Sequence, residues 1–197
     1  MVEEQSAGGT DLTEFKQQIS KEVMAQTKFF KDFPKKGINF MDLFSITTKP
    51  ALFRKVIDAL KTLIEVEVGR PGEAFNYLVG LEARGFVLGP ILAMEYGLPF
   101  TAIRKKGKLP GDTIVEEYKL EYGSDACEIQ KEVLDQSSRV LILDDLLATG
   151  GTLCAAMNLI QKCDGAQVVA SVVVFDIPAL KGRDKLTKAC HALISLD

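Results

Sequence analysis

The sequence has no long hydrophobic run, no excess of basic residues and no start typical of a secretory signal, and each feature argues against a class of protein. Its longest apolar-rich stretch, residues 86–94, is far shorter than the roughly 20 residues of a membrane-spanning helix. With 24 Lys and Arg against 27 Asp and Glu, the net charge is −3, so no broad positive field attracts nucleic acid. Residues 1–9 lack the basic start and apolar run of a secretory signal. We therefore expect neither a membrane nor a nucleic-acid partner.

Cysteine and histidine are also scarce. No two cysteines form a CxxC pair, which favours reduced thiols in the cytoplasm over disulfides or a metal site. The single histidine, His191, lies outside every motif discussed below, and we interpret it as structural. The four cysteines are Cys127, Cys154, Cys163 and Cys190.

The pattern of apolar residues predicts one α/β domain. Short runs rich in β-branched residues at 77–80, 100–103, 140–143 and 168–175 alternate with helical patterns near 85–96, 151–163 and 179–187. Continuous apolar strands separated by helices indicate a mainly parallel, twisted sheet with helices on both faces. Asp11 is expected to open an amphipathic helix, and Pro50 a second one. Residues 1–10 are predicted to be a flexible tail, and residues 11–197 a single domain.

One connection is unusual. Residues 104–123 are polar, carry Gly107, Pro110, Gly111 and Gly123, and show no clear periodicity. A connection of about twenty such residues in a compact domain is typically a functional loop. We therefore favour a mobile loop here over a β-hairpin.

Residues 140–152 carry the strongest functional signal. Four apolar residues predict a buried strand, Asp144 and Asp145 follow at its carboxyl end, and a turn of small residues leads into a helix. Ligands of open α/β sheets bind at this edge. The turn lets backbone N–H groups approach a phosphate, while the carboxylates can accept hydrogen bonds from sugar hydroxyls. The segment matches neither GxxxxGK followed by Ser or Thr nor GxGxxG, so a common triphosphate or dinucleotide loop is disfavoured.

This segment resembles the phosphoribosyl-pyrophosphate signature of type I phosphoribosyltransferases, and its wording, DDLLATGGT, is similar to the adenine-specific branch of that family. The resemblance continues in the family's order at residues 80–86, 103–111 and 120–123, and covers about residues 30–190. It implies the family's α/β fold with a small base-binding hood at about residues 11–45. It also implies transfer of a phosphoribosyl group from phosphoribosyl pyrophosphate to adenine, giving AMP and pyrophosphate.

The resemblance assigns the sugar donor to matching residues. Asp144 and Asp145 would bind the ribose hydroxyls, and Arg84 would contact the pyrophosphate and take part in catalysis, beside a Glu82–Ala83 peptide that is often cis in this family. Arg104 and Lys108 would add charge to the pyrophosphate, from the same or the partner subunit of a homodimer. The 5′-phosphate would lie in the turn made by Ala148, Thr149, Gly150, Gly151 and Thr152.

The base and the closing loop are assigned in the same way. Phe40 would stack on adenine and Ile177 would pack on its other face, while backbone groups of the segment Asn39, Phe40 and Met41 would read its edge. Family members often have a charged residue where Met41 stands, so we expect no polar contact from its side chain. Glu121 and Tyr122 would close over the reacting centre as catalytic residues. Glu121 would either manage a proton of adenine or stabilise cationic character, and the sequence does not decide between these roles.

Mg²⁺ is the implied cofactor, held mainly by the substrate, with Asp144 and Asp145 as the nearest candidate ligands. Each assigned residue also has a plainer interpretation. Arg104 and Lys108 could be solvated, and Arg84 could cap a helix or pair with an acid. Phe40 could belong to the core, and Glu121 could be a surface carboxylate. Three rival functions also remain: an enzyme acting on xanthine, orotate or uracil, a binding module without catalysis, and a relative that binds AMP without turnover.

Overall fold

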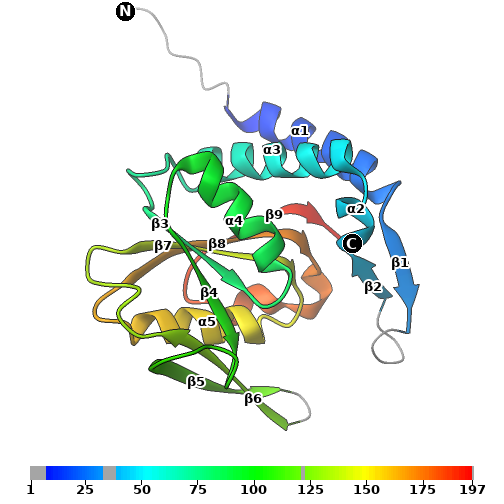
Figure 1. The fold of residues 1–197 in the computed structure, drawn as a ribbon. Coiled ribbons are helices and arrows are strands. Elements are labelled where there is room, and N and C mark those ends of the chain that lie inside the picture. Colours follow the sequence, from blue (N-terminus) through cyan, green and yellow to red (C-terminus); the bar gives the residue numbers. More distant parts are fainter. Residues whose placement is uncertain (1–7, 33–38, 121–122, 197) are drawn as a thin grey trace, which may run out of the picture.

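A seven-stranded sheet forms the centre of the molecule (Figure 1). The structure is a computed structural model and describes residues 8–32, 39–120 and 123–196. The strand order is β5-β6-β4-β3-β7-β8-β9, and a separate two-stranded sheet pairs β1 (Lys28–Lys31) with β2 (Asn39–Asp42). The strands of the large sheet are β3 (Tyr77–Leu81), β4 (Phe100–Lys105), β5 (Thr113–Leu120), β6 (Gly123–Gln130), β7 (Arg139–Leu147), β8 (Gln167–Asp176) and β9 (Cys190–Ser195).

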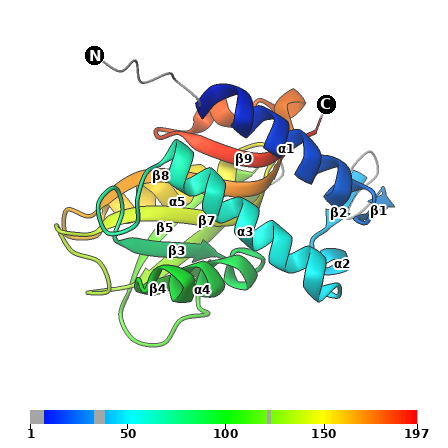
Figure 2. The same cartoon turned by 90° about the horizontal axis from the view of Figure 1, so that it is seen from above.

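Five neighbouring strands, β4, β3, β7, β8 and β9, run parallel to one another. The other two, β5 and β6, form an antiparallel edge beside β4. Three helices cover one face: α1 (Gly8–Met24), α3 (Pro50–Glu67) and α4 (Gly85–Tyr96). α5 (Gly151–Gln161) covers the other face, as Figures 1 and 2 show, and a short helix, α2 (Phe44–Thr47), follows β2. The predicted α/β class, with a mainly parallel sheet between helices, is confirmed.

The core is divided by the sheet into two apolar layers, and β7 contributes to both. Leu141 and Leu143 pack into the layer beneath α3 and α4, while Val140 and Ile142 pack into the layer beneath α5. Successive side chains of a strand point to opposite faces, so a strand covered on both faces must be apolar at every position. This requirement explains why residues 140–143 form a continuous apolar run.

The structure corrects three local predictions. α1 begins at Gly8 rather than Asp11, so residues 8–10 belong to a helix and not to a tail. An apolar stripe reports only the packed turns of a helix, and that stripe begins at Leu12. Residues 178–187 contain two 3₁₀ helices instead of an α-helix, η1 (Pro178–Leu180) and η2 (Gly182–Lys185). They are separated by Lys181, whose left-handed backbone (φ 50°) interrupts a helix.

The third correction concerns the predicted mobile loop at residues 104–123. From Thr113 onward this segment is strand β5, paired residue by residue with β6 from Thr113↔Gln130 to Leu120↔Gly123. A hairpin gains its hydrogen bonds from a partner strand, so local periodicity alone did not reveal it. Residues 121–122 lie outside the described part of the chain.

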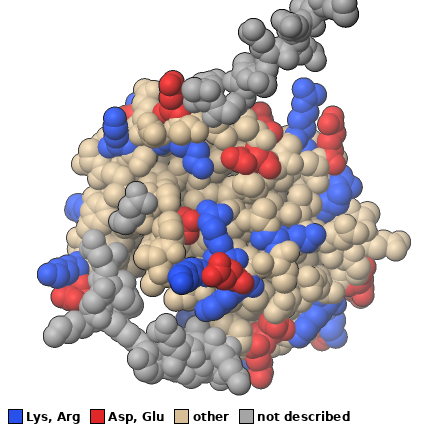
Figure 3. Space-filling view, turned by 180° about the vertical axis from the view of Figure 1, so that it is seen from behind, with Lys and Arg blue, Asp and Glu red and all other residues tan. Residues whose placement is uncertain are grey.

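The surface carries both signs of charge on the face seen in Figure 3, where Lys and Arg side chains are interspersed with Asp and Glu. Among the described residues, no helix combines the length and apolarity required to cross a membrane.

Candidate active site

The pocket lies between β3 and β7, where the order in which the chain adds strands to the sheet reverses. From β3 the chain passes through α4 to β4 on one side, and from β7 it passes through α5 to β8 on the other. The connections of two neighbouring parallel strands therefore diverge, which opens a crevice at their carboxyl ends, the usual ligand site of such sheets. A pocket of about 200 Å³ occupies this crevice, lined by Glu82, Arg84, Asp144, Asp145, Leu146, Leu147, Ala148, Thr149, Gly150, Gly151, Thr152 and Leu153.

The turn of residues 148–152 presents the start of α5 to the pocket. Gly150 is the N-cap residue with a left-handed backbone (φ 77°), and the helix begins at Gly151. The first N–H groups of an α-helix have no partner within the helix and carry the positive end of its dipole. Such a terminus binds anions, phosphate above all, so the structure places a suitable anion site beside the two aspartates.

Arg84 and the two aspartates form a charged group in which Asp145 is buried and the other two are partly exposed. Asp145 is 3% exposed, and its Oδ2 accepts a hydrogen bond from Nε of Arg84. Burial lowers the pKa of Arg84, but the charge and hydrogen bond of Asp145 outweigh this effect and raise it overall. Burial, together with the negative charge of Asp145, raises the pKa of Asp144 well above its usual value. Asp145 is therefore paired with Arg84, whereas ionisation of Asp144 carries a cost from burial and from the neighbouring charge.

This cost predicts that Asp144→Asn stabilises the ligand-free protein. Because the folded-state pKa of Asp144 is raised, the folded state binds more protons above pH 4 than the unfolded state does, and stability falls as pH rises through this range. Asn removes this cost and keeps the side-chain oxygen that accepts the N–H of Asp145 at 2.9 Å. We expect a higher melting temperature for the variant at pH 7, with roughly 2–4 °C for each kcal/mol gained.

Thermal unfolding of the ligand-free protein at pH 4, 5.5 and 7 measures this effect. The advantage of Asp144→Asn should shrink toward pH 4, where the wild-type carboxyl is itself protonated. A variant that melts below the wild type at pH 7 would contradict the assigned burial cost.

Glu82 is a pocket residue that the sequence interpretation did not assign to the site. Its carboxylate accepts hydrogen bonds from Nε and Nη2 of Arg104 at 3.2 and 3.1 Å, and from the backbone N–H of Lys105 at 3.0 Å. The hydrogen bonds from Arg104 lower the pKa of Glu82, against the effect of burial. The peptide bond between Glu82 and Ala83 is cis. Arg104 thus reaches the rim of the pocket through Glu82. The sequence signal that could have assigned Glu82 to the site is its position only two residues before Arg84.

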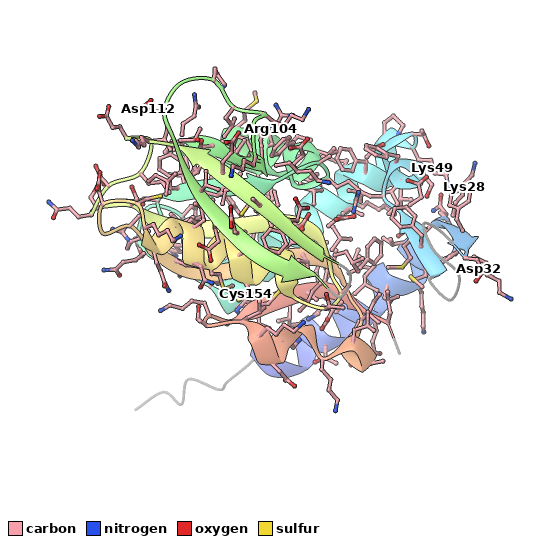
Figure 4. All side chains as sticks on the ribbon, turned by 90° about the horizontal axis from the view of Figure 1, so that it is seen from below. Lys28, Asp32, Lys49, Arg104, Asp112 and Cys154 are labelled. Atoms are coloured by element: carbon pink, nitrogen blue, oxygen red, sulfur yellow. The ribbon has the colours of Figure 1, made fainter. Side chains whose placement is uncertain are left out.

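Lys108 lies outside the pocket that contains the two aspartates. The buried carboxylate of Glu128 accepts the backbone N–H groups of Lys108 and Leu109, both at 2.8 Å, and the carbonyl of Lys108 accepts a bond from Nη1 of Arg104 at 2.9 Å. With Lys105 and others, Lys108 lines a separate hollow beside the β5–β6 hairpin. In Figure 4, Arg104 lies apart from Lys28, which begins β1, from Asp32, which follows β1, and from Lys49, which precedes α3. The structure therefore does not bring Lys108 into the pocket of the aspartates.

Of the predicted base-binding residues, Phe40 and Ile177 lie near the pocket residues, whereas Met41 lies in the core. Phe40, on β2, lies beneath the guanidinium of Arg84, whose Cζ is 5.6 Å from the ring centroid. Met41 points the opposite way and is buried in the core at 6% exposure. Ile177 follows β8, and its N–H donates to the carbonyl of Leu147 at 2.9 Å, at the same edge of the sheet. Asn39 is the first residue of β2, while Glu121 and Tyr122 lie outside the described residues.

Comparison with known proteins agrees with this geometry. Residues 44–194 match the model of the phosphoribosyl transferase domain, and the chain therefore belongs to the phosphoribosyltransferase family. Within it, the chain groups with the adenine phosphoribosyltransferases, as its resemblance predicted. The enzyme of Debaryomyces hansenii is 42% identical over 90% of this chain and 92% of its own length, and that of Candida albicans is 45% identical over 89% of each.

Solved structures support the same grouping. The adenine phosphoribosyltransferase of Saccharomyces cerevisiae, solved with an imino-altritol bisphosphate and adenine, superposes with a TM-score of 0.85 at 39% identity, covering 90% of this chain and 99% of that one. The enzyme from Thermoanaerobacter pseudethanolicus gives a TM-score of 0.83 at 38% identity, covering 89% of this chain and 99% of that one.

Proposed function

We propose that this chain transfers the 5-phosphoribosyl group of phosphoribosyl pyrophosphate to adenine, giving AMP and pyrophosphate in purine salvage. The observation that carries the proposal is the pocket itself, where the start of α5, an aspartate pair and Arg84 line one crevice. The helix start can bind a phosphate, the aspartates can bind a diol, and Arg84 can bind a second anionic group. The relatives that share this fold and sequence are adenine phosphoribosyltransferases.

The sugar donor would be held at two points. Backbone N–H groups of the 148–152 turn bind the 5′-phosphate, and Asp144 and Asp145 accept hydrogen bonds from the ribose hydroxyls. Arg84, which is hydrogen-bonded to Asp145 in the structure, also faces the pyrophosphate and offsets the charge that develops as it leaves. Arg104, held by Glu82 at the rim, adds positive charge. Lys108, which lies outside the pocket of its own chain, would add charge from the partner subunit of a dimer. Fixing the donor in this way places its anomeric carbon in line with the attacking base nitrogen.

Adenine would lie between the ring of Phe40 and Ile177. Because the side chain of Met41 is buried in the core, reading of the base edge falls to backbone groups of residues 39–41. A site of fixed donors and acceptors rejects hypoxanthine and guanine, whose 6-oxo group reverses the pattern at that position. Glu121 and Tyr122 would complete the site from the tip of the β5–β6 hairpin, and exclude water from the reacting centre.

Mg²⁺ fits this pocket as a partner of the substrate. The ion usually combines one or two carboxylates with substrate phosphates and waters, and here Asp144 and Asp145 are the adjacent carboxylates, of which only Asp145 is bound to Arg84. Among the described residues, no group of three acidic, Cys or His side chains is arranged to hold a metal by itself. When bound, the ion would order the pyrophosphate and offset its charge.

A homodimer in the cytoplasm is part of the same proposal. Exposed aromatic rings support the dimer, since Phe29, Phe30 and Phe44 are 40–50% exposed on or next to the β1–β2 sheet. Apolar side chains exposed in this way can mark protein contacts when they adjoin one another. All four cysteines are free thiols, three of them buried, which suits a reducing compartment.

The direct test is a spectrophotometric assay of AMP formation from adenine and phosphoribosyl pyrophosphate with Mg²⁺. We expect turnover with adenine, and a Glu121→Ala variant should lose about 10²- to 10⁴-fold, the usual contribution of a positioned acid or base. Hypoxanthine is the control substrate and should be turned over far more slowly. Comparable rates with both bases would contradict the assigned specificity, and AMP binding without any turnover would indicate a binding module instead.

A further inference from the structure

The η2 segment, which follows β8, lies directly against the 148–152 turn. Gly182 is buried, and a Cβ atom added to it would overlap the carbonyl oxygen of Ala148 and lie 2.9 Å from the amide nitrogen of Gly150. Conversely, a Cβ atom on Gly150 would overlap the carbonyl oxygen of Gly182. The two backbones are therefore in direct contact, with no room for a side chain between them. The position of η2 limits the positions that the turn can adopt.

Arg183, the next residue of η2, anchors this segment to the sheet. Its Nε donates to Oδ2 of Asp176 at 2.8 Å, its Nη2 lies 2.7 Å from the same oxygen in an ion pair, and its Nη1 donates to the carbonyl of Cys190. Asp176 is the last residue of β8 and only 2% exposed, and Cys190 is the first residue of β9. A single guanidinium thus joins η2 to the ends of two neighbouring strands. Because the planar group makes two hydrogen bonds in different directions and an ion pair with Asp176, it favours one orientation of η2.

The same region is tied to the strand that leads into the turn. Leu147, at the end of β7, pairs with Asp176, and its carbonyl accepts the N–H of Ile177 at 2.9 Å. The 148–152 turn is therefore bounded by β7, β8 and η2. Arg183 is not among the described residues that line the pocket. Any effect of Arg183 on ligand binding must therefore pass through the 148–152 turn.

We propose that Asp176, Gly182 and Arg183 are positioning residues for the 5′-phosphate site, an inference that rests on the proposed function. Several backbone N–H groups must meet one phosphate together, so the turn has to be held in place before the ligand arrives. The buried Asp176 supplies a fixed charge, Arg183 transmits its position to η2, and Gly182 supplies the close backbone contact.

The test compares the two substrates in wild type, Arg183→Ala and Arg183→Lys. In Arg183→Ala we expect the KM for phosphoribosyl pyrophosphate to rise about tenfold or more and the KM for adenine to stay within about twofold, because a misplacement of about 1 Å can reduce a rate by on the order of 100-fold. Arg183→Lys should fall between them, since an ammonium can bond to Asp176 without the fork geometry. Calorimetry with phosphoribosyl pyrophosphate and Mg²⁺, without adenine, should show the same order of affinities.

Lys185→Ala is the matched control, because it removes a positive charge from the exposed side of the same short helix. It should leave both KM values near those of the wild type. The same rise in Lys185→Ala would overturn the proposal in favour of simple charge attraction. Equal rises for both substrates, or a lowered melting temperature with an unchanged KM for phosphoribosyl pyrophosphate, would also overturn it.

Two further comparisons keep the outcome decisive. If Arg183→Ala does not fold, Asp176→Asn and Arg183→Lys report on the same contacts, and both should weaken phosphoribosyl pyrophosphate selectively. A wild-type protein that binds phosphoribosyl pyrophosphate but forms no AMP would contradict the proposed function, while the calorimetric affinities of the variants would still decide the positioning role.

Discussion

Replacing Arg84 with alanine is expected to reduce AMP formation by about 10²- to 10³-fold and to destabilise the folded protein. The loss of activity follows from removing a fixed positive charge that faces the leaving pyrophosphate. The loss of stability follows from Asp145, whose side chain is 4% exposed and would be left without its guanidinium partner. Breaking a buried pair on one side costs about 3–5 kcal/mol, and we expect the lower end because Arg84 is 32% exposed.

Steady-state kinetics and urea unfolding measure the two effects separately. Arg84→Lys keeps a charge near Asp145, so it should recover most of the stability but little of the activity, because lysine cannot reproduce the guanidinium geometry. Lys55→Ala is a suitable control for a surface pair, since Lys55 and Glu22 are 54% and 36% exposed. It should change stability by less than about 1 kcal/mol. An Arg84→Ala variant as stable as the wild type would show that Asp145 needs no partner.

The second large effect is expected from Gly150→Ala. The residue has φ 77°, where an alanine is strained by about 1–2 kcal/mol, and the new methyl group would also overlap the carbonyl oxygen of Gly182. The turn must shift to relieve this overlap, so we expect a total loss of more than about 3 kcal/mol and the loss of binding of phosphoribosyl pyrophosphate.

Gly72→Ala separates the two causes. Gly72 has a similar backbone angle, φ 82°, but an added Cβ meets nothing within 4 Å. Its variant should therefore show the backbone strain alone, about 1–2 kcal/mol in urea unfolding, with unchanged AMP formation. If both variants lose equal stability and Gly150→Ala remains active, the contact between Gly150 and Gly182 does not hold the turn.

Much of the fold could be predicted because its signals are local. Residues 140–152 contain a buried strand, two acids, a turn and the start of a helix in one continuous stretch, and the structure has β7 and α5 at these positions. The apolar runs near residues 78, 101 and 170 likewise became parallel strands, since a strand buried on both faces is apolar throughout. The hairpin of β5 and β6 was missed because its pairing joins residues that no local pattern relates.

The candidate site likewise has a part that local sequence predicted and a part that only the tertiary structure decided. The sequence by itself predicted a phosphate site at residues 148–152 beside Asp144 and Asp145, because the chain supplies these groups consecutively. The family resemblance added Arg84 to this prediction. Only the tertiary structure decided that Arg84 bonds to Asp145, that Glu82 holds Arg104, and that Gly182 and Arg183 lie behind the turn. These contacts join residues from different strands and connections, and distance along the chain does not report which of them meet. Charge pairing and close backbone packing act through space, so they became visible only once the sheet had brought its carboxyl ends together.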